Sequence, residues 1–297
     1  MPEARHGALE EWATWLFSPT WSAILVAVAV AITFPLIFHW FLYRKTAAKE
    51  LPSFLLVGPS GSGKTSLFTL LANGSTSTTH TSQEPQDAIC QLPSKIRSSD
   101  DKYRSENDNA PRSQPKFQLV DTPGHGKLRH HALSSMTARS ALKGLLFVVD
   151  SAAISSAAGL AEAAEFLHDI LLVLQKRHTQ SRSSKGPTSI PVLVAANKQD
   201  VFTSLPTAMV KKKLEEEIAK VRQSKSKGVV DSGIDVDDNP GADDEQDWLG
   251  EYGSSDFRFS QMEEHGIDIK VMGGNVKGEG DQAGHIDGWW VWVGENI

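Results

Sequence analysis

The order of apolar and polar positions divides the chain into a long uncharged N-terminal run and a body of short alternating elements. No Asp, Glu, Lys or Arg occurs over residues 12–43. Four short apolar stretches typical of buried strands follow, at 51–57, 117–120, 144–149 and 190–196. Three segments have helical periodicity, at 64–72, 161–175 and 207–222. Strands that alternate with helices predict an α/β domain with a mostly parallel, doubly wound sheet.

The uncharged run predicts one transmembrane helix over residues 21–43. At a rise of about 1.5 Å per residue this segment reaches about 34 Å, enough to cross a hydrocarbon core of about 30 Å. Tryptophan and tyrosine stand near both of its ends, as in an interfacial belt. A cleaved signal peptide is disfavoured because the run is too long and follows mainly acidic residues, and a buried core helix of this length and even apolarity is rare.

Basic residues around the run predict its orientation. Arg5 is the single Lys or Arg before it, whereas Arg44, Lys45 and Lys49 follow closely. The positive-inside rule therefore places residues 44 onward in the cytosol and the N-terminus outside or in a lumen. The expected organisation is a lumenal segment at 1–20, a span at 21–43, a linker at 44–50 and a globular domain at 51–297.

Composition adds three points. The chain is 40% hydrophobic and 22% charged with a formal charge of −6, which disfavours nucleic-acid binding by bulk electrostatics. A single cysteine, Cys90, excludes an intramolecular disulfide and is typical of a reducing compartment. Two polar stretches, 86–114 and 225–247, interrupt the pattern and are expected to be insertions. The second contains eight acidic residues and contributes much of the net charge.

Residues 58–65, GPSGSGKT, match the phosphate-binding pattern G-x-x-x-x-G-K-[ST] and lie between a predicted strand and a predicted helix. Glycines let backbone N–H groups curl around phosphates at the helix N-terminus. Lysine then neutralises the β and γ phosphates, and the threonine hydroxyl ligates Mg²⁺. The predicted nucleotide-binding residues here are Gly58, Pro59, Ser60, Gly61, Ser62, Gly63, Lys64, Thr65 and Ser66, with Thr65 also a metal ligand.

Two tetrapeptides after later strands narrow the nucleotide to one with guanine. Asp121 begins DTPG, in which the carboxylate can hold the Mg²⁺ shell and the Gly124 amide can sense a γ-phosphate. Asn197 begins NKQD, which continues with Lys198 and ends at Asp200. The Asp200 carboxylate can accept the N1–H and the 2-amino group of guanine, and adenine offers neither donor.

These motifs resemble the small GTPase superfamily, Arf/Sar-like branch, and within it the family of signal recognition particle receptor β subunits, in a fungal form. Four features carry the resemblance: a single N-terminal span directly before the core, the segment DTPGHGKLR at 121–129, the strand GLLFVVDS at 144–151, and THTSQEP at 79–85. The two polar stretches have no counterpart in it.

The resemblance implies further site residues. His125 stands where Ras-like proteins hold a glutamine and would orient the attacking water. Thr79 is the expected switch ligand of Mg²⁺, with Thr78 and Thr81 as alternatives. Gly273 and Gly274 stand where the family contacts guanine and would do so through backbone N–H groups. Residues 285–297 resemble the family's closing helix, and their tryptophans are expected to pack in the core.

The implied function is a membrane-anchored GTP-binding subunit, with GTP and Mg²⁺ as its ligands and slow intrinsic hydrolysis. In its GTP state it would bind the receptor α subunit at the endoplasmic reticulum membrane. It would thereby support targeting of ribosomes to the translocon, with no direct nucleic-acid contact. An Arf/Sar-like vesicle-traffic GTPase with a transmembrane anchor is the alternative. A membrane-attached ATPase or kinase is a third, and NKQD counts against it.

Overall fold

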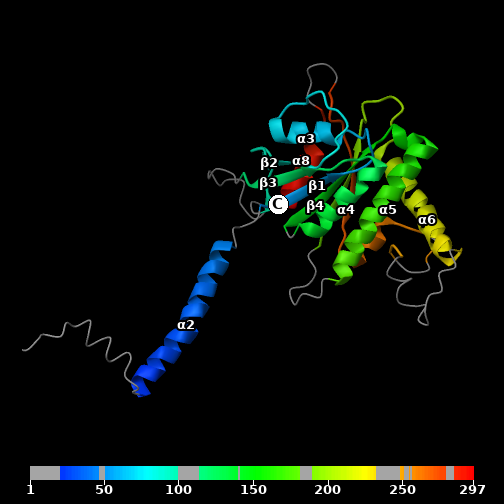
Figure 1. Ribbon diagram of the computed structural model, residues 1–297. Coiled ribbons are helices and arrows are strands. Elements are labelled where there is room, and N and C mark those ends of the chain that lie inside the picture. The colour runs from blue at the N-terminus through cyan, green and yellow to red at the C-terminus, as the bar shows by residue number, and fades with distance from the viewer. Residues whose placement is uncertain are drawn as a thin grey trace, which may run out of the picture. The chain divides into compact units, whose positions relative to one another are not determined.

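The computed structural model describes residues 21–46, 51–99, 114–139, 141–180, 189–231, 248–250, 254, 256–278 and 284–297 (Figure 1). The chain divides into two compact units, residues 1–50 and residues 51–297. The predicted lumenal segment, the linker from 47 onward and most of the acidic stretch lie outside the described residues.

The described residues of the N-terminal unit form the helix α2 (Trp21–Thr46), over the segment that the uncharged run predicts to be helical. Its large apolar side chains are mostly exposed within the unit, for example Leu25 and Phe34, and the ring of Phe34 stacks on Phe38 with centroids 6.0 Å apart. Pro35 lies inside the helix. A search of the described residues finds no helix that is both long and apolar enough to cross a membrane.

The second unit is built on a six-stranded sheet in the order β2-β3-β1-β4-β5-β6. Its strands are β1 (Ser53–Val57), β2 (Gln86–Gln91), β3 (Lys116–Asp121), β4 (Leu142–Asp150), β5 (Val192–Asn197) and β6 (Ile269–Gly273). Every pair is parallel except β2 with β3. The four central apolar strands read from the sequence are therefore present, and the predicted α/β architecture is confirmed.

Helices cover both faces of the sheet, as a doubly wound fold requires (Figure 1). The helices are α3 (Lys64–Asn73), α4 (Arg129–Ala138), α5 (Ala157–Gln180), α6 (Thr207–Asp231) and α8 (Asp287–Glu295), with short 3-10 helices η2 (Gly126–Leu128), η3 (Ala153–Ser155) and η4 (Phe259–His265). One buried apolar cluster contains residues of α4, α5, α6 and η4, and a second contains residues of α3 and α8. Successive residues of β1 and β4 alternate between the two clusters, because neighbouring strand residues point to opposite faces.

The structure differs from the sequence prediction at both polar stretches. The segment expected to be an insertion from residue 86 begins with β2, whose Cys90 is buried and lies opposite Phe117 of β3. Helix α6 continues to Asp231, into the second stretch. Inserted chain therefore occupies less of each stretch than composition indicates.

The closing helix α8 is present, and two of its tryptophans are core residues. Trp289 and Trp292 are buried, and the Trp292 ring meets Phe54 of β1 edge to face with centroids 6.0 Å apart. Gly294 supports this packing, because a Cβ there would lie 2.5 Å from the Arg97 carbonyl oxygen. The core role expected for these tryptophans is confirmed.

Candidate nucleotide-binding site

The loops that follow β1, β3 and β5 meet at the carboxyl edge of the parallel sheet and surround a cavity of about 340 Å³. Parallel strands bring loops that are distant in sequence to this one edge, which is where open α/β sheets bind ligands. The cavity is lined by Ser60, Gly61, Gly63, Lys64, Thr65, Ser66, Thr79, His80, Thr81, Ser82, Gly124, Asn197, Lys198, Asp200, Val201, Val276 and Lys277. Three motifs read separately from the sequence thus line one cavity.

The loop after β1 needs glycine at two positions for steric reasons. Gly58 has φ +141°, and a Cβ there would lie 2.1 Å from the Val148 carbonyl oxygen of β4. Gly63 has φ +95°, and a Cβ there would lie 2.3 Å from Nδ2 of Asn197. Both positions combine a left-handed backbone with a close approach, so a side chain at either is excluded. The loop ends at Lys64, where α3 begins.

Lys64 is buried and donates a hydrogen bond from Nζ to the Pro59 carbonyl oxygen at 2.8 Å. Burial lowers the pKa of Lys64 from 10.5 to about 8, while the carboxylates of Asp121 and Glu162 act in the opposite direction. A phosphate beside this ammonium group would stabilise the charged form further, because an opposite charge at close range raises the pKa of an amine.

Asp121, at the end of β3, is fully buried and accepts a hydrogen bond at Oδ2 from the Thr65 hydroxyl at 2.7 Å. Its second oxygen, Oδ1, has no hydrogen-bond partner among the described residues. Burial raises the pKa of this carboxyl, and the hydrogen bond from Thr65 opposes that effect. An unpartnered buried carboxylate oxygen beside a threonine hydroxyl fits a cation and its water shell.

The segment 79–85, which holds Thr79 and is called the first switch from here on, reaches the start of α3. The hydroxyls of Thr79 and Ser66 lie 3.1 Å apart, and both residues line the cavity. Thr81 also lines it, whereas Thr78 does not. This arrangement favours Thr79 among the three candidate ligands.

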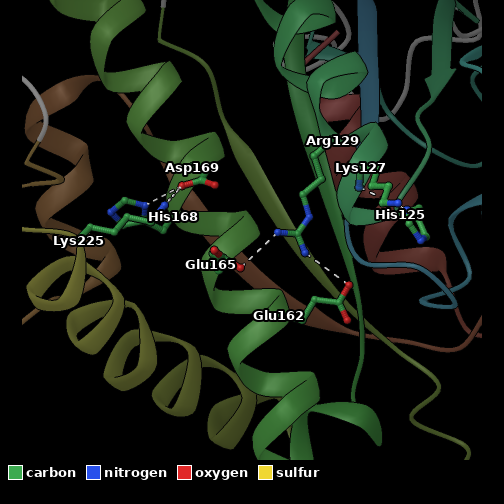
Figure 2. A network of polar contacts seen from close by, with 8 residues as sticks. All are labelled: His125, Lys127, Arg129, Glu162, Glu165, His168, Asp169 and Lys225. Atoms are coloured by element: carbon green, nitrogen blue, oxygen red, sulfur yellow. Dashed lines mark hydrogen bonds and ion pairs between the residues drawn. The ribbon is translucent and has the colours of Figure 1, made fainter. Parts of the chain in front are cut away.

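Residues 122–128, within the DTPGHGKLR segment, are called the second switch from here on; they enter the cavity through Gly124 but not through His125. A Cβ on Gly124 would lie 2.4 Å from Nζ of Lys64, so the backbone packs directly on the phosphate loop. His125 is exposed and absent from the cavity lining, and its ring accepts a hydrogen bond from the Lys127 N–H at 3.3 Å (Figure 2). The predicted water-positioning histidine therefore stands outside the cavity in this conformation.

Asn197 joins three loops, since its buried amide donates from Nδ2 to the Ser62 carbonyl oxygen at 2.8 Å and accepts at Oδ1 from the Val276 N–H at 3.0 Å. Lys198, at φ +62°, donates from Nζ to the Gly61 carbonyl oxygen at 2.9 Å and to Asp150 at 2.7 Å. Sequence reasoning missed Asp150, although a carboxylate at the end of an apolar strand was the available signal. Asp200 lines the cavity as predicted.

The loop after β6 differs in detail from the prediction. Gly273 and Gly274 do not line the cavity, and the Gly274 N–H donates to the Ala196 carbonyl oxygen. Val276 and Lys277 line it instead. The glycines serve packing, because a Cβ on Gly274 would lie 2.8 Å from the Trp289 ring. Four other predicted site residues are also not part of the cavity lining, namely Gly58, Pro59, Ser62 and Asp121.

The sheet is doubly wound, and three turns surround one cavity at its edge: the phosphate-binding turn, an Asp-x-x-Gly turn and an Asn-Lys-x-Asp turn. This combination defines a nucleotide switch protein of the P-loop GTPase class. The family model described as "Signal recognition particle receptor beta subunit" matches residues 49–266. The chain is 31% identical over 257 residues to the signal recognition particle receptor subunit beta of Saccharomyces cerevisiae, covering 85% of this chain and 88% of that protein. It is 30% identical to the human subunit over 91% of this chain and 83% of that protein.

Solved structures agree with the sequence relatives. The signal recognition particle receptor SRb-GTP/SRX complex from Chaetomium thermophilum matches with a TM-score of 0.64 and 35% identity, covering 83% of this chain and 100% of that one. The SRb-GDP-Mg structure from the same organism matches with a TM-score of 0.59 and 36% identity, covering 84% and 99%. The chain belongs to the signal recognition particle receptor β subunit family. The family predicted from the sequence is confirmed, and the Arf/Sar-like alternative is not favoured.

Proposed function

We propose that this chain binds GTP with Mg²⁺ and uses the bound nucleotide to control assembly with the α subunit of the signal recognition particle receptor. The observation that carries the proposal is the single cavity shared by the phosphate loop and the Asn197–Asp200 turn. In it, Lys64 and the loop amides would hold the phosphates, and Asp200 would select guanine. Val276 and Lys277 are better placed than Gly273 and Gly274 to contact the base.

The residues at the phosphate end fit Mg²⁺. Thr65 would supply a hydroxyl ligand, Thr79 would close the shell from the first switch, and Asp121 would hold a metal-bound water through its unpartnered oxygen. Among the described residues, no three His, Cys, Asp or Glu side chains gather into a metal site. That suits Mg²⁺, which is usually held by one or two protein ligands, phosphates and water rather than by a protein cage.

Switching would operate through two segments that already touch the phosphate loop. The GTP γ-phosphate would meet the Gly124 N–H, and Thr79 would follow the metal, so both switches would be ordered together. His125 would have to turn into the cavity to orient water. Its outward position supports slow hydrolysis by the chain alone and a role as a binding switch rather than a rapid enzyme.

The partner and the membrane come from the family. A relative was solved as an SRb-GTP/SRX complex, which supports a partner that recognises the GTP-bound form. We place the protein at the endoplasmic reticulum membrane, with residues 21–43 as a single anchor, the N-terminus lumenal and the nucleotide-binding unit cytosolic. Support for the anchor is the uncharged run of 32 residues at 12–43 and the three basic residues after it. Alkaline carbonate extraction of membranes checks the anchor, since release of the chain would contradict it.

The test of partner control uses the full chain in detergent, loaded with GDP or with a non-hydrolysable GTP analogue, and offered the α subunit. The GTP-analogue form should retain the α subunit and the GDP form should lose it. Thr65→Ala should abolish the difference because it removes a metal ligand. Thr69→Ala, on the same helix but outside the cavity, is the matched control and should behave like the unchanged chain. Equal retention in both nucleotide states would refute the proposal.

A further inference from the structure

Helix α4 follows the second switch directly, and its first residue is bound to α5. The Arg129 guanidinium forms ion pairs with Glu162 at 3.4 Å and with Glu165 at 3.5 Å, one turn apart on α5 (Figure 2). It also lies over the Phe166 ring, 4.8 Å from the ring centroid. The Arg129 side chain is 17% exposed, whereas the two carboxylates are about half exposed. One side chain thus ties the start of α4 to three residues of α5.

The C-terminal end of α4 is also bound to α5, in this case by an arginine that belongs to α5. Arg177 of α5 donates hydrogen bonds to the carbonyl oxygens of Met136 at 2.6 Å and of Arg139 at 3.1 Å. These carbonyls lie at the C-terminus of α4, where helix carbonyls lack intrahelical partners. Between the two arginines, Ala132 and Met136 are buried in the core cluster that includes α5. α4 is therefore clamped to α5 at both ends.

α5 is itself a fixed support. Phe166 is fully buried and meets Phe147 of β4 edge to face, with ring centroids 5.9 Å apart. The apolar face of α5 packs into the core from Leu160 to Leu174. A helix clamped to α5 is consequently held to the central sheet.

The upstream end of the second switch is fixed as well. Thr122 is fully buried, and both its N–H and its hydroxyl donate to the Leu56 carbonyl oxygen, at 3.2 Å and 2.7 Å. Between Thr122 and Arg129 lie six residues, 123–128, which include two glycines and the exposed His125. Gly124 packs on the phosphate loop through its backbone, and neither glycine carries a side chain that could add further contacts.

We infer that Arg129 is a positioning residue that ends the second switch at residue 128, so that the loop 123–128 moves with the nucleotide while α4 stays fixed. This inference rests on the proposed nucleotide switch. It assigns α4 to the rigid scaffold and confines the response to a short loop that carries Gly124 and His125. Removing the Arg129 contacts would extend the moving segment into the first turn of α4.

Hydrogen–deuterium exchange on the full chain in detergent, with GDP or a non-hydrolysable GTP analogue, tests this inference. In the unchanged chain, the exchange difference between the two nucleotide states should stop at residue 128. In Arg129→Met it should spread to residues 130–133, whose amides should exchange about five- to tenfold faster, the size expected for two partly exposed ion pairs and a cation–π contact. A Glu162→Gln, Glu165→Gln double variant should spread the difference in the same direction but to a smaller extent, because it removes the ion pairs and leaves the contact of Arg129 with the Phe166 ring.

Arg139→Met is the matched control, because Arg139 also belongs to the α4 region but pairs with Asp87 of β2 at 3.2 Å. It should leave exchange at 130–133 unchanged. A nucleotide-dependent difference that already runs through α4 in the unchanged chain, or an Arg129→Met chain with unaltered α4 exchange, would overturn the inference. If the chain retained neither nucleotide, the proposed function would be overturned instead. The effect of Arg129→Met on the exchange rates of α4 amides could then still be measured without nucleotide, and it would test the contacts between α4 and α5.

Discussion

Asn197 offers the sharpest test of how the site is held together, because one buried amide connects the phosphate loop to the loop after β6. Asn197→Ala would leave the Ser62 carbonyl oxygen and the Val276 N–H without partners, and both residues are almost fully buried. An unsatisfied buried group costs about 1–3 kcal/mol, so the two together should cost about 2–6 kcal/mol. For a unit of this size that corresponds to a fall in Tm of about 4–24 °C.

The matched control is Asn275→Ala, which also removes two side-chain hydrogen bonds, to the Lys277 carbonyl oxygen and from the His285 N–H. These two bonds are exposed, so water replaces them and the cost should stay below about 1 kcal/mol. Urea unfolding of both variants and the unchanged chain, without nucleotide and with EDTA, measures the difference. Asn197→Asp should be worse than Asn197→Ala, because it would place a carboxylate oxygen against the Ser62 carbonyl oxygen. If Asn197→Ala cost no more than Asn275→Ala, the structural role of Asn197 would be wrong.

Two further predictions concern a buried amine and a buried guanidinium. Burial lowers the pKa of Lys64 from 10.5 to about 8, so between these values the unfolded chain binds a proton that the folded chain has released. Lys64 should therefore contribute a rise in the free energy of unfolding without nucleotide across that window, by up to about 3 kcal/mol. Burial raises the pKa of Cys90 from 9.0 to about 11, which acts in the opposite direction, so the Lys64 contribution is read as the difference between urea titrations of the unchanged chain and of Lys64→Met. The same pH dependence in both chains would contradict the assignment. Arg222 is buried and donates to the carbonyl oxygens of Leu249, Ser254 and Asp256, so Arg222→Met should cost about 2–4 kcal/mol. The exposed Lys220→Met should cost clearly less than Arg222→Met in the same unfolding assay, and equal costs would refute the buried role.

Sequence reasoning predicts the elements whose burial is strong and misses those whose burial is weak. β1, β4 and β5 each contain a continuous run of buried apolar residues, because both of their faces are covered. β2 has one buried residue in six, so its edge position hides it inside a polar stretch. β6 has no buried residue, and α4 has only Ala132 and Met136, so neither carries a readable period.

The site divides in the same way. The phosphate loop can be predicted from the sequence because local steric contacts require its glycines. Asp121 and Asn197 can be predicted because each follows an apolar strand. The contribution of the loop after β6 cannot be predicted in this way, because it depends on where α8 and the Asn197 amide place that loop. A glycine pair there suggested backbone contact with a base, whereas Gly274 is required by the Trp289 ring.

The arginine contacts around α4 also cannot be predicted from the sequence. Arg129 and Glu162 are 33 positions apart, and nothing in either segment indicates that they meet. Contacts of this kind depend on how two helices cross, which local patterns do not encode.

The most direct test of the central claim is the affinity of the full chain for GTP and for ATP, measured alongside Asp200→Asn. The unchanged chain should bind GTP at least a hundredfold more tightly than ATP, because adenine would leave the Asp200 carboxylate unpaired. Asp200→Asn should lose most of this preference by weakening GTP binding. Equal affinity for the two nucleotides in the unchanged chain would contradict a guanine-nucleotide switch.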